Sequence, residues 1–476
     1  MQITYQQASH RQRWLFYIAL VVVLVVGGLL VAGSQALLFV DTNDFQRVVG
    51  HLNLTPLGDG LRWALSSQPS RTPGNPEIAS HIFTFAGWVQ RYLPGSVFDL
   101  ARTALVAKCL LVVCACVLAW QCTQALQRGA WWFCCFALAW LAVFFMAHNI
   151  GMAQSFYAEY AFLIAFPLLL IGMLARNRGA RLVCLGLGVF VCGLAKVQYF
   201  YVPLLALVCV WVASWWQRVA TDKALLKLLL AIQVLCLVPM LIGKNAALNG
   251  HHGLYLGSYM VLTPAQLDKL GVPAAERACI GVDAWGNAFA GEGGTEVKRN
   301  APTCFPETPR LSKRDVLRPY MHYPQALMGL AQYALPSHFT VHYFHVFPGN
   351  FYLKRVEGGA QAVTDLLLGM TDARESYITP MTPFFLLAAL AFFAISRSRK
   401  AQALRSMAAA GLLLGLFVAS QIVVAMLGEG VRDLSKHLWA AQLALDMLVL
   451  LIALQALGWL CNWRQAPTGH SQAELS

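Results

Sequence analysis

Charged residues are scarce in this chain. Asp, Glu, Lys and Arg make up 12% of its 476 residues, whereas hydrophobic residues make up 58%. A soluble domain carries about 25% charged residues, so this composition excludes an ordinary soluble protein. The mean hydropathy of +0.57 and the long apolar runs indicate an integral membrane protein instead.

Cysteine patterns for metal or redox chemistry are absent from the long polar segment near residues 250–379. It contains no Cys-x-x-Cys pair and no Cys/His spacing typical of a zinc site. Eleven of the 13 cysteines lie in or beside apolar runs, where cysteine is typical as a small buried side chain. Cys279 and Cys304 are the exceptions, and an oxidising compartment would allow them to pair.

Positive charges exceed negative charges by 13. This excess does not indicate a nucleic-acid partner, because Lys and Arg of membrane proteins gather in short cytoplasmic loops. The short loop 148–158 has no Lys or Arg. This uneven distribution of Lys and Arg among the short loops predicts that both termini are cytoplasmic (N-in/C-in). It also predicts that two long segments, 41–102 and 250–379, lie outside. The basic short loops hold Arg128; Arg176, Arg178 and Arg181; Arg218, Lys223 and Lys227; and Arg397, Arg399, Lys400 and Arg405.

The apolar runs predict an all-α polytopic membrane protein with about 10 transmembrane helices. The first run follows Arg11 and Arg13 and is too long for the core of a signal peptide, so we expect an uncleaved first span. Spans five and six are short and could form a re-entrant pair, which would change the count. The expected spans are 14–38, 103–124, 130–147, 159–175, 182–195, 199–216, 224–243, 380–396, 406–427 and 437–459.

The spans divide the chain into three parts. Residues 1–249 form an N-terminal transmembrane module with a first outer loop at 41–102. Residues 250–379 form an extracytoplasmic segment, in which Pro264 predicts a short helix over Thr263–Leu270. Residues 380–476 hold the last transmembrane helices and a cytoplasmic tail. No internal repeat is visible in the sequence.

Two carboxylates follow the first span, in the stretch "FVDTNDFQRVVGHL". Asp41 and Asp44 fit the start of a helix, where the dipole favours a negative charge. The other interpretation is that one of them faces a catalytic cavity as a general base. On a helix, Arg47 would lie beside Asp44 and orient it, because residues three apart share a face.

Other ionisable residues stand where a polar loop meets a span. Glu159 follows Tyr157 at the start of the fourth span, and Lys196 and Gln198 lie in the turn between spans five and six. An acid at this depth costs free energy unless it is paired or hydrated. An ordinary interfacial position remains the alternative for Glu159, as does snorkelling to the interface for Lys196.

The last outer turn, "GEGVRDLSKHLW", carries Glu429, Arg432, Lys436 and His437. Net positive charge in an outer turn runs against the usual bias of membrane proteins. Together with Lys196, the cations Arg432, Lys436 and His437 are therefore candidates to hold a phosphate.

These features resemble the GT-C superfamily of integral-membrane glycosyltransferases, and most of all a poorly characterised bacterial group within it. The plan is also similar to that of pilin arabinosyltransferases. The resemblance extends over the spans in order and rests on short motifs. They are Asn43-Asp44-Phe45-Gln46-Arg47-Val48, Phe156-Tyr157-Ala158-Glu159, Ala195-Lys196-Val197-Gln198, Lys436-His437-Leu438 and the stretch "LDKLGVPAAERACIG". One departure is that two residues separate Asp41 from Asp44, whereas the superfamily often has adjacent acids.

The resemblance implies an inverting transfer of a hexosyl or pentosyl group from a polyprenyl-phosphate sugar, at the periplasmic face of a bacterial inner membrane. Asp44 is the expected general base, and Asp41 or Glu159 would bind hydroxyl groups or polarise the base. The acceptor would be a glycan, a lipid or a protein such as pilin, and membrane lipid would surround the enzyme. No cofactor is certain. A divalent metal, Mg²⁺ or Mn²⁺, stays an open alternative, although no residue spacing in the sequence requires one.

Two other functions remain open. A flippase or transporter of lipid-linked sugars would use the same charged residues without a base, and paired broken helices would favour it. A lipid-linked polysaccharide polymerase or ligase would use basic residues such as the run 310–318, with a histidine as base.

Overall fold

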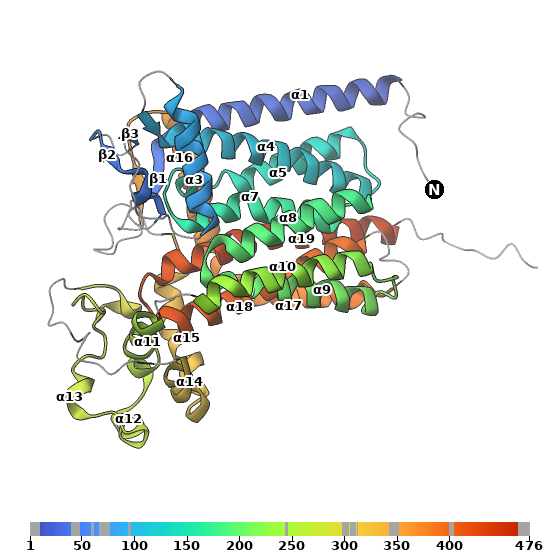
Figure 1. The fold of residues 1–476 in the computed structure, drawn as a ribbon. Helices are drawn as coiled ribbons and strands as arrows, with labels where there is room; N and C mark the ends of the chain where they lie inside the picture. The colour runs from blue at the N-terminus through green and yellow to red at the C-terminus, as the bar shows by residue number, and fades with distance from the viewer. Residues whose placement is uncertain are drawn as a thin grey trace, which may run out of the picture.

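The computed structural model describes residues 10–39, 48–58, 61–65, 77–93, 97–242, 246–297, 304, 311, 313–341, 352–398 and 404–464. Roughly parallel helices form a bundle, and short helices and strands cap one end of it (Figure 1). The bundle helices are α1 (His10–Gly33), α4 (Leu100–Ala125), α5 (Ala130–Phe144), α7 (Ala161–Leu174), α8 (Arg178–Ala195), α9 (Val202–Trp216), α10 (Lys223–Ile242), α17 (Thr382–Ile395), α18 (Arg405–Glu429) and α19 (Leu434–Arg464).

Within the described residues, seven helical segments are long and apolar enough to cross a membrane. α5 and the short helix α6 (Ala147–Ala153) meet at 65° and would make an eighth span if they are one broken helix. α8 and α9 both qualify, which favours two spans over a re-entrant pair, whereas α7 is shorter. The seven segments are Gln12–Ala36, Leu100–Ala125, Arg178–Ala195, Val197–Trp216, Gln361–Ile395, Arg405–Glu429 and Leu434–Leu460.

The cap contains helices from both predicted outer segments. These are α3 (Ile78–Arg91), α11 (Ala246–Tyr255), α12 (Pro264–Leu270), α13 (Ala274–Arg277), α14 (Lys313–His322), α15 (Gln325–His338) and α16 (Gln361–Tyr377). Short 3₁₀ turns connect elements at η2 (Ser34–Ala36), η3 (Gly50–Leu52), η4 (Ala158–Tyr160), η5 (Val197–Tyr199), η6 (Ser258–Val261), η7 (Glu292–Gly294) and η8 (Thr379–Met381). The predicted helix after Thr263 is confirmed as α12, with a capping box between Thr263 and Gln266.

Two small antiparallel sheets hold the cap segments together. β1 (Leu37–Phe39) pairs with β5 (Leu353–Arg355), so the chain leaving α1 is bonded to a strand far along the sequence. β2 (Leu54–Pro56), β3 (Arg62–Leu65) and β4 (Val97–Asp99) form the second sheet in the order β2-β3-β4. The chain around the first outer loop and the later segment therefore meet at the same end of the bundle (Figure 1).

The first span ends earlier than the apolar run predicts, because α1 stops at Gly33 and η2 and β1 come next. Ending a helix inside the protein leaves carbonyl groups that need donors. Lys108 of α4 donates to the carbonyl of Ser34 (3.0 Å) and to Oε1 of Gln154 (2.9 Å). Gln154 in turn donates to the carbonyls of Gln35 and Leu37. Two buried polar side chains thus replace the missing helical hydrogen bonds.

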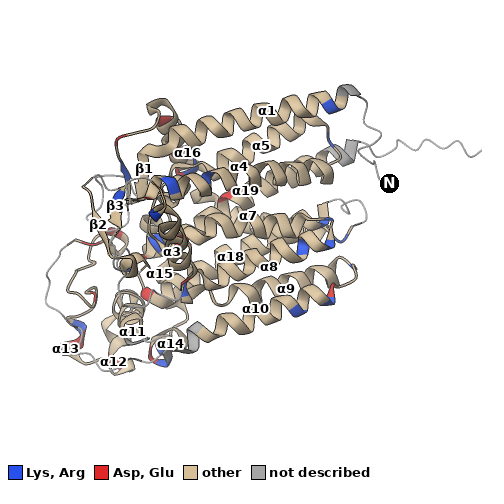
Figure 2. Cartoon of the chain, turned by 45° about the horizontal axis from the view of Figure 1, so that its top comes forward, with Lys and Arg blue, Asp and Glu red and all other residues tan. Residues whose placement is uncertain are grey.

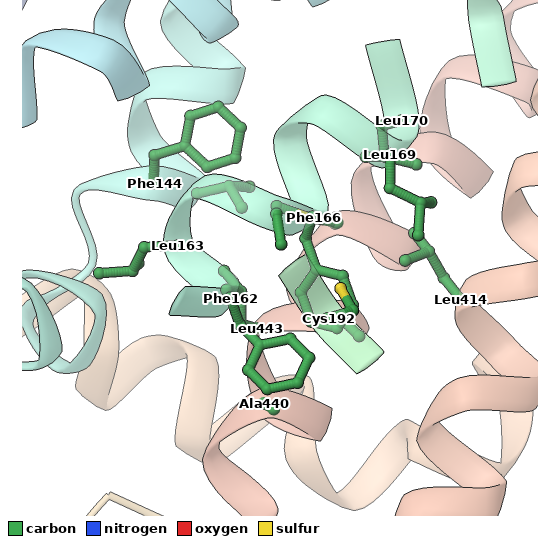
Figure 3. Close-up of a cluster of buried hydrophobic side chains, with 14 of the residues drawn as sticks. Phe144, Phe162, Leu163, Phe166, Leu169, Leu170, Cys192, Leu414, Ala440 and Leu443 are labelled. Atoms are coloured by element: carbon green, nitrogen blue, oxygen red, sulfur yellow. The ribbon is translucent and has the colours of Figure 1, made fainter. Parts of the chain in front are cut away.

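α7 lies at the centre of the bundle core. Its Phe162, Phe166 and Leu170 pack among side chains of α5, α8, α18 and α19 (Figure 3). α7 and α8 approach so closely that a Cβ on Gly172 would lie 2.4 Å from the backbone nitrogen of Leu185. Small residues at such contacts let helix backbones pack directly, which stabilises bundles in lipid. The start of α7, which carries Glu159 just before it, is therefore rigidly placed.

The bundle end remote from the cap is basic (Figure 2). It holds Arg178 and Lys223 at the starts of α8 and α10, and Arg178 pairs there with Asp222 at 2.9 Å. This separation of basic loops from the cap matches the loop pattern on which the expected orientation depends.

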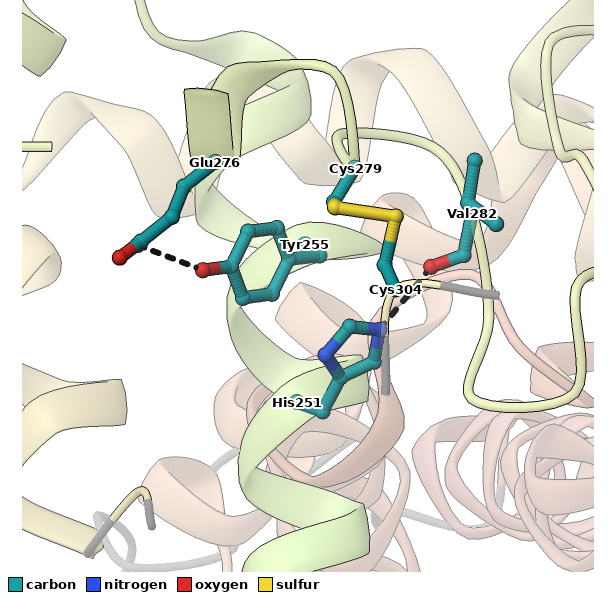
Figure 4. The surroundings of a disulfide bond; sticks show 6 residues. All are labelled: His251, Tyr255, Glu276, Cys279, Val282 and Cys304. Carbon is teal, nitrogen blue, oxygen red and sulfur yellow. Dashed lines mark hydrogen bonds between the residues drawn. A yellow bond between two sulfur atoms is a disulfide. The ribbon is translucent and has the colours of Figure 1, made fainter. Parts of the chain in front are cut away.

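A disulfide between Cys279 and Cys304 ties part of the cap together across 25 residues (Figure 4). The pairing that an oxidising compartment would allow is thus present. Beside it, Tyr255 of α11 donates to Glu276 (2.9 Å) and His251 Nε2 lies 3.1 Å from the carbonyl of Val282. These contacts fasten α11 to α13 and to the loop after α13.

The turn between α18 and α19 locks the bundle to the cap at Gly430. This residue has φ +60° and ψ −132°, and a Cβ there would lie 2.0 Å from the carbonyl oxygen of Leu256. The next residue, Val431, donates its N–H to that same carbonyl at 2.7 Å. Only glycine fits this position without moving α11 away from the turn.

Replacing Gly430 by alanine is expected to destabilise the protein by roughly 1–3 kcal/mol, because the change combines an unfavourable φ with a backbone overlap. Thermal unfolding of the detergent-solubilised protein would measure the loss. Gly428→Ala is the matched control, since a Cβ at Gly428 meets nothing within 4 Å. Equal melting temperatures for the two variants would contradict the proposed lock.

Candidate functional site

Four of the residues expected to act together do meet in space. Glu159 lies in η4, Lys196 comes directly after α8, and Lys436 and His437 belong to the first turns of α19. All four side chains are buried, at the end of the bundle that carries the cap. With Glu429, Arg432, Asp433 and Asp283 they form a group that we call the charged cluster.

The centre of the charged cluster is a chain of contacts through Lys196. Its Nζ lies 3.3 Å from Oε1 of Glu159 and 3.2 Å from Nδ1 of His437. On the other edge of the ring, His437 Nε2 lies 3.2 Å from Oε2 of Glu429. An ammonium group can only donate, so Nδ1 of His437 accepts the hydrogen bond from Lys196.

Glu159 keeps one carboxylate oxygen unused. Oε1 faces Lys196 and lies 3.7 Å from His437 Nδ1. Oε2 is buried and has no hydrogen-bond partner among the described residues. A buried acceptor without a donor is costly, so this oxygen is suited to receive a hydrogen bond from a bound molecule or from water.

Lys436 forms the outer part of the charged cluster. Its Nζ lies 2.8 Å from Oδ2 of Asp433 and 5.8 Å from the centre of the Tyr157 ring. Burial alone would raise the pKa of Asp433, but Lys436 and Arg432 outweigh it and hold that pKa well below its usual range. Asp433 is therefore an anion at neutral pH.

Arg432 reaches from the same turn into the cap. It pairs with Asp283 and lies 3.6 Å from Asp433. Its guanidinium group is 4.4 Å from the ring centre of Trp285, which is a cation–π distance. Arg432 therefore fastens the α18–α19 turn to the loop after α13.

Local structure explains why so many carboxylates surround these cations. Lys436 and His437 stand in the first turn of α19, where the helix dipole disfavours positive charge. Asp433, directly before the helix, and Glu429, at the end of α18, offset this unfavourable position. Gln421 of α18 further fixes the turn by donating to the carbonyl of His437 at 3.0 Å.

The candidate phosphate-binding residues lie close to carboxylates. Lys196, Lys436, Arg432 and His437 each already have a carboxylate neighbour in the described structure. Cations and carboxylates nearly balance, because charges buried in a membrane protein must be compensated. An incoming phosphate would therefore have to displace a carboxylate rather than enter an empty cationic site.

Several predicted residues lie outside the described residues or outside the charged cluster. Asp41, Asp44 and Arg47 fall in 40–47, which the structure does not describe. The choice of Asp44 as base consequently remains a prediction. Gln198 lies in η5 next to Lys196, and its Nε2 has no partner within the described ranges.

A metal site is not formed by the residues that the structure describes. They contain no group of three or more His, Cys, Asp or Glu side chains arranged to hold a metal ion. A divalent metal would therefore need ligands from outside these ranges or from a bound substrate.

A second buried ionic network had not been expected. Asp446 of α19 accepts from Arg374 of α16 (2.7 Å) and lies 3.1 Å from His148 of α6. Arg374 also contacts Glu375 and Thr379. Asp446 is the only acid in its apolar run, and an ionisable residue inside a span signals a paired or functional site. That signal was in the sequence, whereas its partner Arg374 could not be found without the fold.

A cavity of about 810 Å³ opens in the cap beside β1, which is within the usual size range of ligand sites. Its lining includes Arg62 of β3, Lys354 and Arg355 of β5, and Glu357. Because β5 pairs with β1, the cavity lies next to the strand that leads into the stretch carrying Asp41 and Asp44.

Comparisons with known proteins agree with a multi-pass membrane protein. A family model described as the YfdI N-terminal transmembrane domain matches residues 306–473. The "Uncharacterized protein YfdI" of Escherichia coli strain K12 is 25% identical over 336 residues, covering 67% of this chain and 68% of that protein. No solved structure matches the chain. These descriptions name no reaction, so the resemblance to glycosyltransferases stays a proposal.

A double-mutant cycle tests the pairing of Glu159 with Lys196. Glu159→Gln and Lys196→Met should each lower the free energy of unfolding by about 3–5 kcal/mol, since each leaves a buried charge without its partner. The double variant should lose much less than the sum, as measured by denaturant titration. Arg178→Gln with Asp222→Asn, an exposed pair, is the control and should couple by less than about 1 kcal/mol. Additive losses at Glu159 and Lys196 would refute the pairing.

Acid should loosen the contact between the cap and α19. Burial lowers the pKa of both His252 and His338 to about 4, and His252 Nε2 accepts from the N–H of Ala284. In the unfolded chain these rings take up a proton near pH 6.5. In the folded protein they are still neutral at that pH. Their contribution to stability is thus complete above about pH 6.5 and falls as the pH drops toward about 4.

Melting temperatures near neutral pH and at about pH 5 would show this loss. His338→Gln should narrow the difference between the two conditions, because one of the two rings no longer titrates. If the melting temperatures of this variant at the two pH values differ as much as those of the unsubstituted protein, His338 does not contribute to the loss of stability in acid.

Proposed function

We propose that the protein is a GT-C-type glycosyltransferase with ten spans and both termini in the cytoplasm. It moves a sugar from a polyprenyl-phosphate donor to an acceptor at the periplasmic face of a bacterial inner membrane. The observation that carries the proposal is the meeting of Glu159, Lys196, Lys436 and His437 in one buried cluster. Motifs that are distant in the chain supply it, at the end of the bundle opposite the basic loops.

The donor phosphate binds by exchanging partners within the charged cluster. Lys436 is the cation most open to exchange, because its partner Asp433 keeps 21% of its side chain exposed whereas Glu159 is fully buried. The phosphate takes the place of Asp433 on Lys436 and draws on the positive charge of Lys196 beside it. Exchange of one anion for another keeps the buried charges balanced.

Glu159 acts as a positioning residue and not as the base. Its Oε1 is held by Lys196, which lowers its basicity, and its free Oε2 can accept a hydroxyl hydrogen of the donor sugar. The carboxylate thereby fixes both the cation beneath the phosphate and the sugar attached to it.

The reaction is a single displacement at the anomeric carbon. The acceptor oxygen forms the new C–O bond, while the bond from the anomeric carbon to the phosphate oxygen breaks and its electron pair stays on the polyprenyl phosphate. Asp44 takes the acceptor proton, because a sugar hydroxyl needs a base as its oxygen bonds to carbon. The cations stabilise the charge that grows on the leaving phosphate.

The cavity beside β1 provides room for the acceptor. Its lining of Arg62, Lys354 and Arg355 suits an acceptor rich in hydroxyl groups or carrying negative charge. A flippase would need the same cluster without Asp44, so product formation separates the two functions.

Asp44→Asn should lower the transfer rate by at least about 100-fold and leave donor binding intact, because general bases contribute about 10²–10⁴-fold. The assay follows radiolabelled sugar from a synthetic polyprenyl-phosphate donor to periplasmic glycans in proteoliposomes. Asp41→Asn is the matched control and should have the smaller effect. Full activity of the Asp44 variant would remove Asp44 from the mechanism, and labelled lipid crossing the bilayer without product would indicate a flippase.

Asp433→Asn should tighten donor binding by about three- to tenfold, because the amide no longer competes with the phosphate for Lys436. Asparagine also tolerates the positive φ of this position, which is 49°. Binding of polyprenyl phosphate would be measured by calorimetry at two salt concentrations. Weaker binding by this variant would mean that Asp433 helps to hold the donor and that no exchange takes place.

A further inference from the structure

α3 in the cap exposes a stripe of large apolar side chains. Phe85 is 65% exposed, Trp88 55% and Tyr92 76%, and Val89 and Leu93 are exposed between and beyond them. The spacing places these residues on one side of the helix. Phe85 stacks on Trp88 with ring centres 6.0 Å apart, and Trp88 meets Tyr92 at 5.4 Å. Such a large apolar patch marks a contact surface.

The opposite side of α3 is anchored to the ends of two bundle helices. Phe83 is buried against Tyr160, directly before α7, with ring centres 5.1 Å apart. Gln90 accepts from the N–H of Asp99 (2.6 Å) and donates to Thr103 (3.0 Å) at the start of α4. α4 is one of the segments long enough to cross a membrane. α3 therefore lies at the level where that span begins.

The helix that carries the apolar stripe also adjoins the part of the bundle that would face lipid. α3 packs against α8, whose exposed residues include Val183 and Leu187 within a candidate span. Val197 is exposed in η5, between α8 and α9. Exposing this apolar surface to water would cost about 25 cal/mol per Å². In contrast, Trp and Tyr side chains are favoured at the headgroup level of a bilayer.

We propose that α3 lies in the membrane interface, with Phe85, Trp88 and Tyr92 among the headgroups and upper acyl chains of the adjacent leaflet. Because Phe83 on its other side contacts Tyr160, the neighbour of Glu159, this helix sets the depth of the charged cluster at the level of lipid phosphates. The inference concerns lipid contact and does not depend on glycosyl transfer.

Three tryptophans of nearly equal exposure allow a matched test. Trp88 is 55% exposed, Trp211 in α9 is 56% exposed, and Trp285 in the cap is 55% exposed. Each is replaced by Phe in the full chain, which is placed in lipid nanodiscs. The fluorescence lost in each variant reports that tryptophan alone. The quenchers are iodide in water, phosphatidylcholine brominated near the glycerol backbone, and phosphatidylcholine brominated near the chain ends.

Trp88 should be quenched most by bromines near the glycerol backbone and at least about threefold less by iodide than Trp285 is. Trp211 should respond to the brominated lipids, and Trp285 to iodide. If Trp88 responds to iodide as Trp285 does, α3 faces water and the proposal fails. If no quencher reaches Trp88, protein covers the stripe and the proposal also fails.

A second reporter keeps the test valid if one variant is unstable. Tyr92→Trp in the Trp88→Phe background moves the tryptophan about one turn along the same stripe. It should show the same lipid pattern as Trp88. If brominated lipid quenches Trp88 but not the tryptophan placed at position 92, only one residue of the stripe contacts lipid. That result would overturn the placement of the helix.

Discussion

The central physical constraint is that an ionic group buried in an apolar bundle must carry its own counter-charge. Glu159 and Lys196 satisfy it by pairing from separate segments, and His437 lies between Lys196 and Glu429. Because no member can be left unpaired without a large loss, the ends of α7, α8, α18 and α19 are forced into one arrangement. The same balance makes the charged cluster selective, since an anion enters only when another leaves.

α19 carries both buried ionic networks. Near its start, His437 contacts Lys196, and further along the helix Asp446 binds Arg374 of α16. α16 follows β5 in the chain. β5 pairs with β1, the strand that comes just before the stretch containing Asp44 in the sequence. The proposed phosphate site is thus linked through α19, α16 and β5 to β1, the strand that precedes residues 40–47 in the chain.

Composition and apolar runs were enough to predict a helical membrane protein. The short motifs singled out Glu159, Lys196 and His437, which the fold brings together. Their pairing was not predictable, because Lys196 and His437 are 241 positions apart. They come together only because η5 packs against α18 and η4 packs against α19. The early end of α1 at Gly33 was also missed, since its apolar run continues and the side chain that bonds the carbonyl of Ser34, Lys108, comes from another helix. Asp446 was missed although its place within an apolar run was a visible signal. The sequence allowed a disulfide between Cys279 and Cys304 but did not require one. The fold of the cap shows that the two cysteines pair.

The most direct measurement is a structure of the protein with polyprenyl phosphate bound in a lipid nanodisc. We expect the phosphate to lie within hydrogen-bond distance, about 2.7–3.2 Å, of Lys436 Nζ. We also expect Asp433 to have moved away from Lys436 while Glu159 still holds Lys196. A phosphate bound elsewhere, with all the pairs of the charged cluster intact, would contradict the proposed exchange of anions.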